Sequence, residues 1–283
     1  MAKGKHKGKQ KHRKHNGNGA SQAELADKYE LYLRSVQCPE AEVPFFDRVY
    51  HQAYGRTPRI LREDFCGTAA VSCEWARLGP ERRAFAVDLD PEPLRWGETH
   101  NLAHLPIETR SRVKLIEGDV RRARSPKADV LAAQNFSFFY FKTRPEVVEY
   151  FRCVYRHLAA RGVVVLDMFG GPDVMREDLR DKRKFKGFKY IWDQHRFDPI
   201  THHCTFLIHF RFDDGSELNR AFVYDWRLWS IPEVREMLAE AGFARSDVYW
   251  EGTDDNNEGN GVFSPQVHAE SDLAWVAYVV GIK

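Results

Sequence analysis

Residues 60–70 read ILREDFCGTAA, an apolar beginning followed by acidic residues and then by a turn of small residues. The pattern predicts a strand over residues 59–62 and a helix over residues 69–78, joined by that turn. A small-residue turn that leads into a helix exposes backbone N–H groups, which bind a negatively charged group of a ligand. The segment therefore predicts a strand–turn–helix unit with a ligand site at the turn.

Strands and helices alternate over the residues that follow. Further apolar strands are expected at residues 84–88, 113–117, 128–133 and 163–167, and a last one at residues 275–280. Capping patterns mark where helices begin, in the pairs Asp90 and Pro91, Thr143 and Glu146, and Ser230 and Glu233. This alternation predicts a parallel sheet with helices on both faces.

The composition is that of an ordinary soluble globular protein: of 283 residues, 43% are hydrophobic and 30% are charged. No apolar run approaches the roughly 18 residues of a membrane-spanning helix, and the N-terminus lacks the apolar stretch of a signal peptide. The five cysteines are scattered without a CxxC pair, which favours reduced thiols over disulfides or a zinc site. We therefore expect a cytoplasmic protein without membrane contact.

The first 20 residues differ from the rest in charge. They contain seven of the 43 Lys and Arg residues and no Asp or Glu, so residues 21–283 keep 36 basic against 41 acidic side chains, a net charge of −5. Because residues 1–20 contain no Phe, Trp, Tyr, Ile, Leu or Val, we expect a disordered basic tail. Such a tail either contacts the phosphates of a nucleic acid or only keeps the chain in solution.

Two further segments are expected around the alternating body at residues 59–283. Apolar residues at three- and four-residue spacing predict an N-terminal helical cap over residues 21–58. Residues 185–229 hold 12 of the 37 aromatic residues, with strict alternation in residues 203–212. Asp-Gly at positions 214 and 215 then predicts a hairpin turn. We expect residues 185–229 to form an antiparallel β insertion that lies over the body as a lid.

Polar residues follow the predicted strands of the parallel sheet. Glu63 follows the first strand, Asp88 ends the second, Asp119 follows the third and Asn135 follows the fourth. Since parallel sheets bind ligands at the carboxyl ends of their strands, these side chains predict a nucleoside-shaped site. Asp88, 25 residues after Glu63, stands where a carboxylate accepts hydrogen bonds from ribose hydroxyls. The alternative is that these acids only cap the helices that follow them.

This series of motifs resembles the class I S-adenosylmethionine-dependent methyltransferases. Their first motif, an acidic residue before a Gly-x-Gly-x-Gly loop, is similar to EDFCGTA at residues 63–69. The resemblance covers residues 59–168 and, more loosely, 220–280. It implies S-adenosylmethionine as the cofactor and a Rossmann-like, doubly wound α/β fold with a mostly parallel seven-stranded sheet. The segments LREDFCGTA, NFS and YDWRLW also resemble a subfamily of uncharacterised bacterial methyltransferase-domain proteins.

The same resemblance implies a role for each residue at the strand ends. Glu63 would orient the methionine amino group, the Gly67 backbone would pass close to the cofactor, and Asp88 would bind the ribose. Asp119 would meet the adenine amino group, and Asn135 would lie near the sulfonium. The implied cofactor-binding set is Glu63, Phe65, Gly67, Asp88, Leu89, Asp119, Val120 and Asn135.

The turn departs from the motif at three positions. Phe65 and Ala69 replace the first and third glycines, so Phe65 is expected to narrow the loop. Asp64 places a charge where a core aliphatic residue is usual. The turn also lacks the G-x-G-x-x-G pattern that lets a backbone approach a pyrophosphate, which disfavours NAD as the ligand.

The insertion supplies candidates for binding a methyl acceptor. Aromatic rings would exclude water and attract a cationic group, and the candidates are Trp192, Tyr224, Trp226 and Trp229. The alternative is that these rings form the insertion's own core. Asn135 and His195 are the candidate catalytic residues, the histidine as a base. The histidines of the insertion and Cys204 lack the spacing of a metal site, so no metal is expected.

Three functions fit these observations. The first is an S-adenosylmethionine-dependent methyltransferase with a small-molecule acceptor, which the lid and the acidic body favour. The second is a methyltransferase acting on RNA or protein recruited through residues 1–20. The third is a non-catalytic binding module whose degenerate loop no longer holds the cofactor. Cofactor affinity separates the third from the others, and salt-dependent affinity for an acceptor identifies the second.

Overall fold

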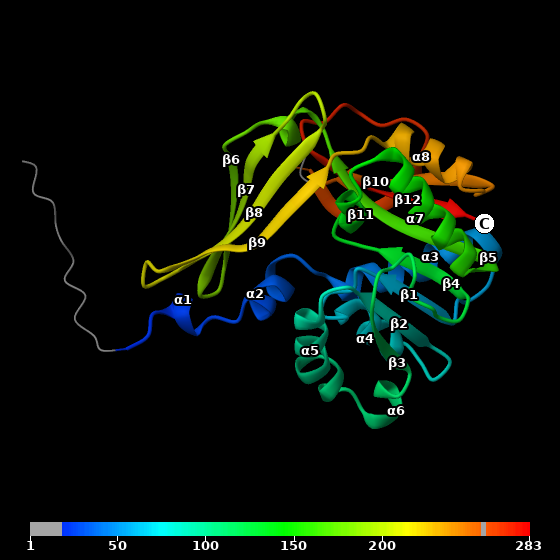
Figure 1. The fold of residues 1–283 in the computed structure, drawn as a ribbon, viewed down its shortest axis with the longest axis horizontal. Helices are drawn as coiled ribbons and strands as arrows, with labels where there is room; N and C mark the ends of the chain where they lie inside the picture. Colours follow the sequence, from blue (N-terminus) through cyan, green and yellow to red (C-terminus); the bar gives the residue numbers. More distant parts are fainter. Residues whose placement is uncertain (1–18, 256–258) are drawn as a thin grey trace, which may run out of the picture.

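The computed structural model describes residues 19–255 and 259–283. Within them, one sheet has the strand order β11-β10-β12-β5-β4-β1-β2-β3 (Figure 1). Its first five strands in sequence run parallel to one another, and β12 runs antiparallel to both β5 and β10. The strands are β1 Ile60–Asp64, β2 Arg83–Asp88, β3 Val113–Glu117, β4 Ala128–Ala133, β5 Leu158–Gly170, β10 Arg245–Thr253, β11 Gly259–Gln266 and β12 Trp275–Ile282.

The expected doubly wound, mostly parallel α/β architecture is confirmed. The expected number of strands in the sheet is corrected, since over the described residues it has eight strands rather than seven. Two strands of this sheet, β10 and β11, lie where no strand was predicted, and β11 pairs antiparallel with β10 at the edge of the sheet. The carboxyl ends of β1, β2 and β4 meet at one edge, where parallel sheets bind ligands.

Helices cover both faces of this sheet (Figure 1). Helices α3 (Pro39–Tyr54) and α4 (Ala70–Arg77) pack on one face, where Phe46 and Trp75 are fully buried. Helices α7 (Arg144–His157) and α8 (Ile231–Glu240) pack on the other, and both begin at the predicted capping boxes. The remaining segments are α5 Pro91–His100, η1 Leu102–His104, α6 Ile107–Arg110, η2 Ser137–Tyr140 and η3 Pro172–Met175. No helix in the described ranges is both long and apolar enough to cross a membrane.

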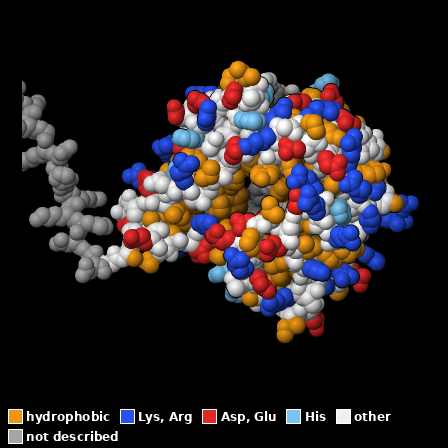
Figure 2. Space-filling model, in the orientation of Figure 1, with side chains coloured by type: hydrophobic (Ala, Val, Ile, Leu, Met, Phe, Trp, Pro, Cys, Tyr) orange, Lys and Arg blue, Asp and Glu red, His pale blue; other side chains and the backbone are white. Residues whose placement is uncertain are grey.

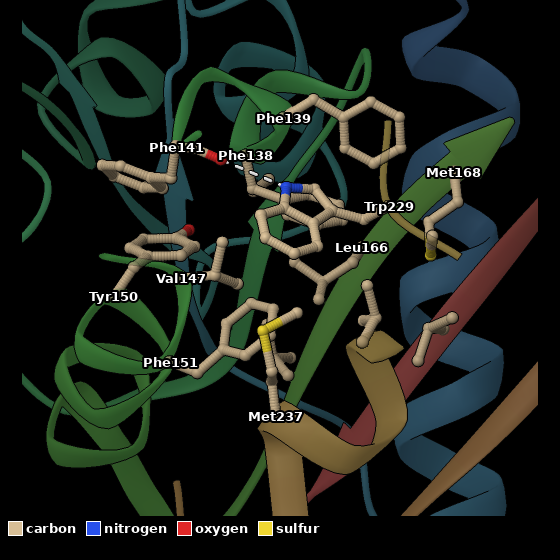
Figure 3. Close-up of a cluster of buried hydrophobic side chains, with 14 of the residues drawn as sticks. Phe138, Phe139, Phe141, Val147, Tyr150, Phe151, Leu166, Met168, Trp229 and Met237 are labelled. Carbon is tan, nitrogen blue, oxygen red and sulfur yellow. Dashed lines mark hydrogen bonds between the residues drawn. The ribbon is translucent and has the colours of Figure 1, made fainter. Parts of the chain in front are cut away.

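The core beneath α7 and α8 is rich in aromatic residues (Figure 3). Phe138 and Phe139 are fully buried there beside Leu166 of β5. Trp229 joins them, and its indole N–H donates a hydrogen bond to the Phe141 carbonyl oxygen at 3.1 Å. The tryptophan therefore buries its ring without leaving its polar group unpaired, which would be costly in an apolar core.

A second, four-stranded sheet in the described residues has the order β6-β7-β8-β9 and is antiparallel throughout. Its strands are β6 Leu179–Phe185, β7 Phe188–Phe197, β8 His203–Phe212 and β9 Glu217–Arg227. The predicted hairpin lies between β8 and β9, where Gly215 adopts a positive φ of 86°. This sheet begins at Leu179 rather than at the expected residue 185. The sequence did not predict β6, because its charged sequence, LRDKRKF, lacks apolar alternation.

The helices expected over residues 21–58 pack on two different sheets. Helix α1 (Gln22–Leu25) joins the β8–β9 hairpin, where its Gln22 N–H donates to Asp214 at 2.9 Å. Helix α2 (Lys28–Ser35) buries Leu31 against the antiparallel sheet. Helix α3 belongs to the core of the parallel sheet. The segment therefore runs from the antiparallel sheet to one face of the parallel sheet (Figure 1).

Candidate functional site

The turn between β1 and α4 is held by Asp88 at the end of β2. Asp88 Oδ2 accepts a hydrogen bond from the Gly67 N–H at 2.7 Å, and Oδ1 accepts one from the Asp90 N–H at 2.9 Å. Burial raises the pKa of Asp88, while these N–H donors act in the opposite direction. Gly67 has a positive φ of 53°, and a Cβ atom built there would meet nothing within 4 Å. The turn thus leaves open space beside its backbone.

Glu63 binds the first turn of α4 from the end of β1. The residue before this helix is Ala69, whose side chain cannot cap it. Glu63 Oε2 instead accepts hydrogen bonds from the backbone N–H and the hydroxyl of Ser72, at 2.9 and 2.5 Å. Burial raises the pKa of Glu63 to about 7, against the effect of the two Ser72 bonds. Its carboxyl group is therefore at once a helix cap and a group at the strand-end site.

Phe65, a partly buried residue of this turn, packs its ring against the core beneath α7. Its ring makes edge contacts with the rings of Phe141 and Tyr150, at centroid distances of 5.9 and 5.7 Å. The residue adopts a positive φ of 58°, so the turn contains a strained non-glycine position.

The third acidic residue already has a partner within the chain. Both oxygens of Asp119 accept bonds from the Arg121 guanidinium, the shortest at 2.6 Å, which lowers the pKa of Asp119. The adjacent Val120 is buried, and its carbonyl oxygen accepts a bond from Arg62 at 2.6 Å. Leu89, next to Asp88, is 65% exposed. A ligand at this end of the site would share Asp119 with Arg121 and cover Leu89.

Asp167 at β5 holds the loop that follows β4. Its carboxylate accepts the backbone N–H groups of Asn135 and Phe136, at 2.7 and 2.9 Å. Both loop residues have positive φ values, 57° and 59°, a conformation that costs free energy for non-glycine residues. Burial raises the pKa of Asp167 to about 7, while the two N–H donors lower it. The Asp167 carboxylate thus fixes a strained loop that contains Asn135, the residue expected to lie near the sulfonium of the cofactor.

We expect the Asp167→Asn substitution to release this loop. One of the two N–H groups would then face an amide NH₂ instead of an acceptor, at a cost of about 1–3 kcal/mol. Faster hydrogen exchange at the Asn135 and Phe136 amides would report the release. Asp129→Asn is the matched control, because Asp129 Oδ2 accepts the N–H groups of Arg59 and Ile60 at the opposite end of the strands. Unchanged exchange in the Asp167 variant would contradict this role.

Three of the four predicted aromatic residues come together on the antiparallel sheet. The Tyr224 and Trp226 rings stack at 4.4 Å, and the Trp192 ring lies 5.9 Å from Tyr224. Trp226 also meets the Phe136 ring at 6.3 Å, which places the group beside the loop held by Asp167. Among the described residues, Trp229 makes no ring contact with this group; it is 3% exposed and shares the buried core of Figure 3 with Trp226, which is 5% exposed.

Figure 2 shows a hollow between the antiparallel sheet and the body of the molecule, with apolar side chains along its wall. The predicted base, His195, is solvent-exposed and lies at a register irregularity of β7. Among the described residues it makes none of the ring contacts of the aromatic group, and its role as a base stays a prediction. Over residues 19–255 and 259–283, no group of three His, Cys, Asp or Glu side chains could hold a metal ion.

Sequence analysis missed three side chains that lie near this site. Asp167 could have been found, since it ends a predicted strand as Asp88 does. Tyr32 of α2 and Glu42 of α3 interact electrostatically with Asp167, although neither follows a strand. Only the packing of the N-terminal helices brings these two residues to the strand ends.

Sequence comparison identifies one curated relative. No protein-family model matches the chain. The protein named "Putative methyltransferase YqeM", from Bacillus subtilis (strain 168), is 23% identical over 201 residues, which cover 67% of this chain and 75% of that protein.

Solved methyltransferase structures have the same fold. An S-adenosylmethionine-dependent methyltransferase from Clostridium acetobutylicum ATCC 824 superposes with a TM-score of 0.65 and 16% identity, covering 89% of this chain and 96% of that one. CalS10, an amino pentose methyltransferase from Micromonospora echinaspora, gives 0.63 and 18%, covering 95% and 99%. KedS8, a sugar N-methyltransferase from Streptoalloteichus sp ATCC 53650, gives 0.62 and 19%, covering 98% and 99%. The chain therefore has the fold of the class I S-adenosylmethionine-dependent methyltransferases, as its motifs indicated.

Proposed function

We propose that the chain is an S-adenosylmethionine-dependent methyltransferase that acts on a small-molecule acceptor. The observation that carries this proposal is the turn at Gly67, which Asp88 holds open at the carboxyl ends of the strands. In a doubly wound sheet this is the place where a nucleoside-containing ligand binds. Two structural neighbours, an amino pentose methyltransferase and a sugar N-methyltransferase, act on small molecules, which supports a small acceptor here.

The residues at the strand ends suit this cofactor. S-adenosylmethionine, when bound, supplies an electrophilic methyl group on a sulfonium. Asp88 would accept hydrogen bonds from the ribose hydroxyls, and the exposed Leu89 would cover one side of the adenine. Glu63 would attract the methionine ammonium group, and Asp119 would accept from the adenine amino group in competition with Arg121. The open space beside Gly67 leaves room for the backbone to approach the ligand.

The aromatic residues of the antiparallel sheet would serve the acceptor. Trp192, Tyr224 and Trp226 would exclude water and favour a cationic group through their ring faces. Asn135, whose backbone is fixed by Asp167, would position the acceptor next to the methyl group. Methyl transfer mainly requires such alignment and desolvation, which these residues are arranged to provide.

Calorimetric titration with S-adenosylhomocysteine tests the cofactor site. We expect micromolar binding to the wild-type chain and at least a 50-fold loss in Gly67→Trp, because the indole would fill the space beside the turn. Gly55→Trp is the matched control: Gly55 also has a positive φ, of 63°, and open space around its Cβ position, but it ends α3 at an exposed site. Equal binding by both variants would contradict the proposed location, and no binding by folded wild-type chain would contradict the enzyme itself.

The basic segment at residues 1–20 motivates the alternative of an RNA or protein acceptor, although residues 1–18 lie outside the described residues. A chain lacking residues 1–20 separates the two proposals. Unchanged turnover with a small acceptor fits the first. Loss of affinity and of salt dependence toward an RNA would favour the second. The five cysteines are all free thiols, which fits our proposal of a cytoplasmic location.

A further inference from the structure

Glu42, in the first turn of α3, has a buried carboxylate oxygen without a partner. Its Oε2 is shielded from solvent and accepts no hydrogen bond from any described residue. Buried polar groups are almost always paired, because leaving one unpaired costs free energy. The first turn of a helix favours a carboxylate, and the Cys38 backbone N–H interacts with this one, yet neither satisfies Oε2.

The surroundings of Glu42 are acidic. Burial raises the pKa of Glu42 to about 8, and the charges of Asp167 on β5, Glu63 on β1 and Glu40 on α3 add to that rise. The phenols of Tyr32 on α2 and Tyr278 on β12 also interact with Glu42. Several carboxyl groups around a buried carboxylate oxygen favour a cation over an anion as its partner.

A second unpaired acceptor lies on the same face of the sheet. Gln134, which follows β4, is 4% exposed, and its side-chain N–H donates to the Val165 carbonyl oxygen at 3.1 Å. Its Oε1 has no partner within the part of the chain that the structure describes. In their strands, Glu63, Gln134 and Asp167 point to the α3 side of the sheet, as Leu61, Val130 and Val165 do. This arrangement of acceptors suits a ligand with several N–H donors.

Aromatic side chains of α2 and the antiparallel sheet lie together near Glu42. The hydroxyls of Tyr32 and Tyr224 interact with each other, which brings α2 against the inner face of β9. Tyr32 also packs its ring against Phe222 at 4.8 Å. Ring faces next to carboxylates form a binding site for ammonium groups carried on an apolar or flat body.

We propose that Glu42 anchors an amine acceptor, binding its ammonium group through Oε2 and then removing a proton from it. This inference rests on the proposed methyltransferase function and specifies its acceptor class as a primary or secondary amine. In the proton transfer, an N–H bond of the ammonium breaks and its electron pair stays on nitrogen. The proton forms an O–H bond with Glu42 Oε2. The nitrogen then carries the lone pair that an acceptor must present.

The experiment compares benzylamine with benzyl alcohol, as a charged and an uncharged probe of similar shape. Each is titrated calorimetrically into the whole chain saturated with S-adenosylhomocysteine at pH 8.5, where Glu42, with a pKa of about 8, is mostly ionised. We expect benzylamine to bind at least tenfold more tightly than benzyl alcohol, and Glu42→Gln to remove this preference. Glu40→Gln is the matched control, because Glu40 lies in the same helical turn but is exposed to solvent.

The outcomes of this experiment separate the role of Glu42 from the proposed methyltransferase function. Equal affinity of wild-type chain for the two probes, no affinity for benzylamine, or an unchanged preference in Glu42→Gln would overturn the role of Glu42 while leaving the methyltransferase proposal intact. Loss of S-adenosylhomocysteine binding in Glu42→Gln would make Glu42 a cofactor ligand instead. Failure of the wild-type chain to bind S-adenosylhomocysteine would overturn the proposed function itself.

Stability against pH provides a readout that needs no ligand. The pKa of Glu42 in the folded chain, about 8, lies above its ordinary value of 4.5, so ionisation opposes folding as the pH rises between these values. Asp167, Glu63 and Glu40 are the acidic groups that interact with Glu42, and all three are present in both chains. We therefore expect Glu42→Gln to melt at a higher temperature than wild type at pH 9, with a smaller difference at pH 5. An equal difference at both values would show that Glu42 is already paired.

Discussion

Replacing Asp88 with Ala should lower the affinity for S-adenosylhomocysteine by about 100-fold or more. The carboxylate would contribute charge-assisted hydrogen bonds to the ribose, each of about 1.5–3 kcal/mol. It also holds the Gly67 N–H at 2.7 Å, so the variant would lose the conformation of the turn at the same time. Isothermal titration calorimetry of the purified variant measures the effect directly.

Asp90→Ala is the control for this loss, because Asp90 is an acidic residue of the same loop with a different task. Its Oδ1 caps α5 by accepting the Glu92 N–H at 2.8 Å. Its removal should cost about 1 kcal/mol of stability but change ligand affinity by less than about threefold. If both variants bound equally well, Asp88 would be no more than a helix-capping residue, which is the alternative that the sequence left open.

The largest loss of stability is expected from Arg62→Ala. Arg62 is fully buried on β1, where its Nε donates to Asp64 Oδ1 at 2.7 Å. Its other donors reach the carbonyl oxygens of Val120 and Ala123 and so fasten the loop after β3. Without the guanidinium, Asp64 would keep only the Tyr150 hydroxyl, at 3.2 Å, as a described partner. Breaking a buried ion pair in this way costs about 3–5 kcal/mol, which urea denaturation would measure.

Two further variants show whether the charge of Asp64 causes that loss. The double variant Arg62→Met with Asp64→Leu removes both charges and should recover part of the stability. Arg77→Ala breaks the exposed pair with Glu74 and should change the free energy of unfolding by less than about 1 kcal/mol. If the double variant is as unstable as Arg62→Ala, the lost stability comes instead from the unpaired carbonyl groups of the loop after β3.

The alternating body was predictable because each of its strands is an apolar segment bounded by a turn. The expected bounds of β3 and β4 agree with the structure, and those of β1 and β2 differ by two residues at most. Strands β6 and β11 carry no such signal: LRDKRKF is charged and GNGVFSPQ contains glycine, proline and asparagine. Each is an edge strand, stabilised by pairing with one neighbour, so its own sequence need not be apolar.

At the site, the strand-end residues were predictable but their partners were not. A search for acidic residues at the ends of predicted strands finds Asp88 and Asp119. It cannot reveal that the Arg121 guanidinium already binds the Asp119 carboxylate. Trp229 was grouped with the aromatic residues of the insertion by its place in the sequence, although it lies beyond β9 and its indole N–H binds the Phe141 carbonyl oxygen. Glu42 lies in a helix distant in sequence, so only the tertiary packing of α3 could identify it.

Helix α2 touches both halves of the proposed site. On one side Asp27 accepts the Trp96 indole N–H of α5 at 2.5 Å, and Lys28 pairs with Glu92 at 2.8 Å, close to the Asp88 loop. On the other side Tyr32 meets Tyr224. A ligand that immobilises α2 from either side therefore reduces the entropy that the other must lose on binding. Cofactor and acceptor should accordingly bind with positive cooperativity, and each should increase the affinity for the other by the same factor.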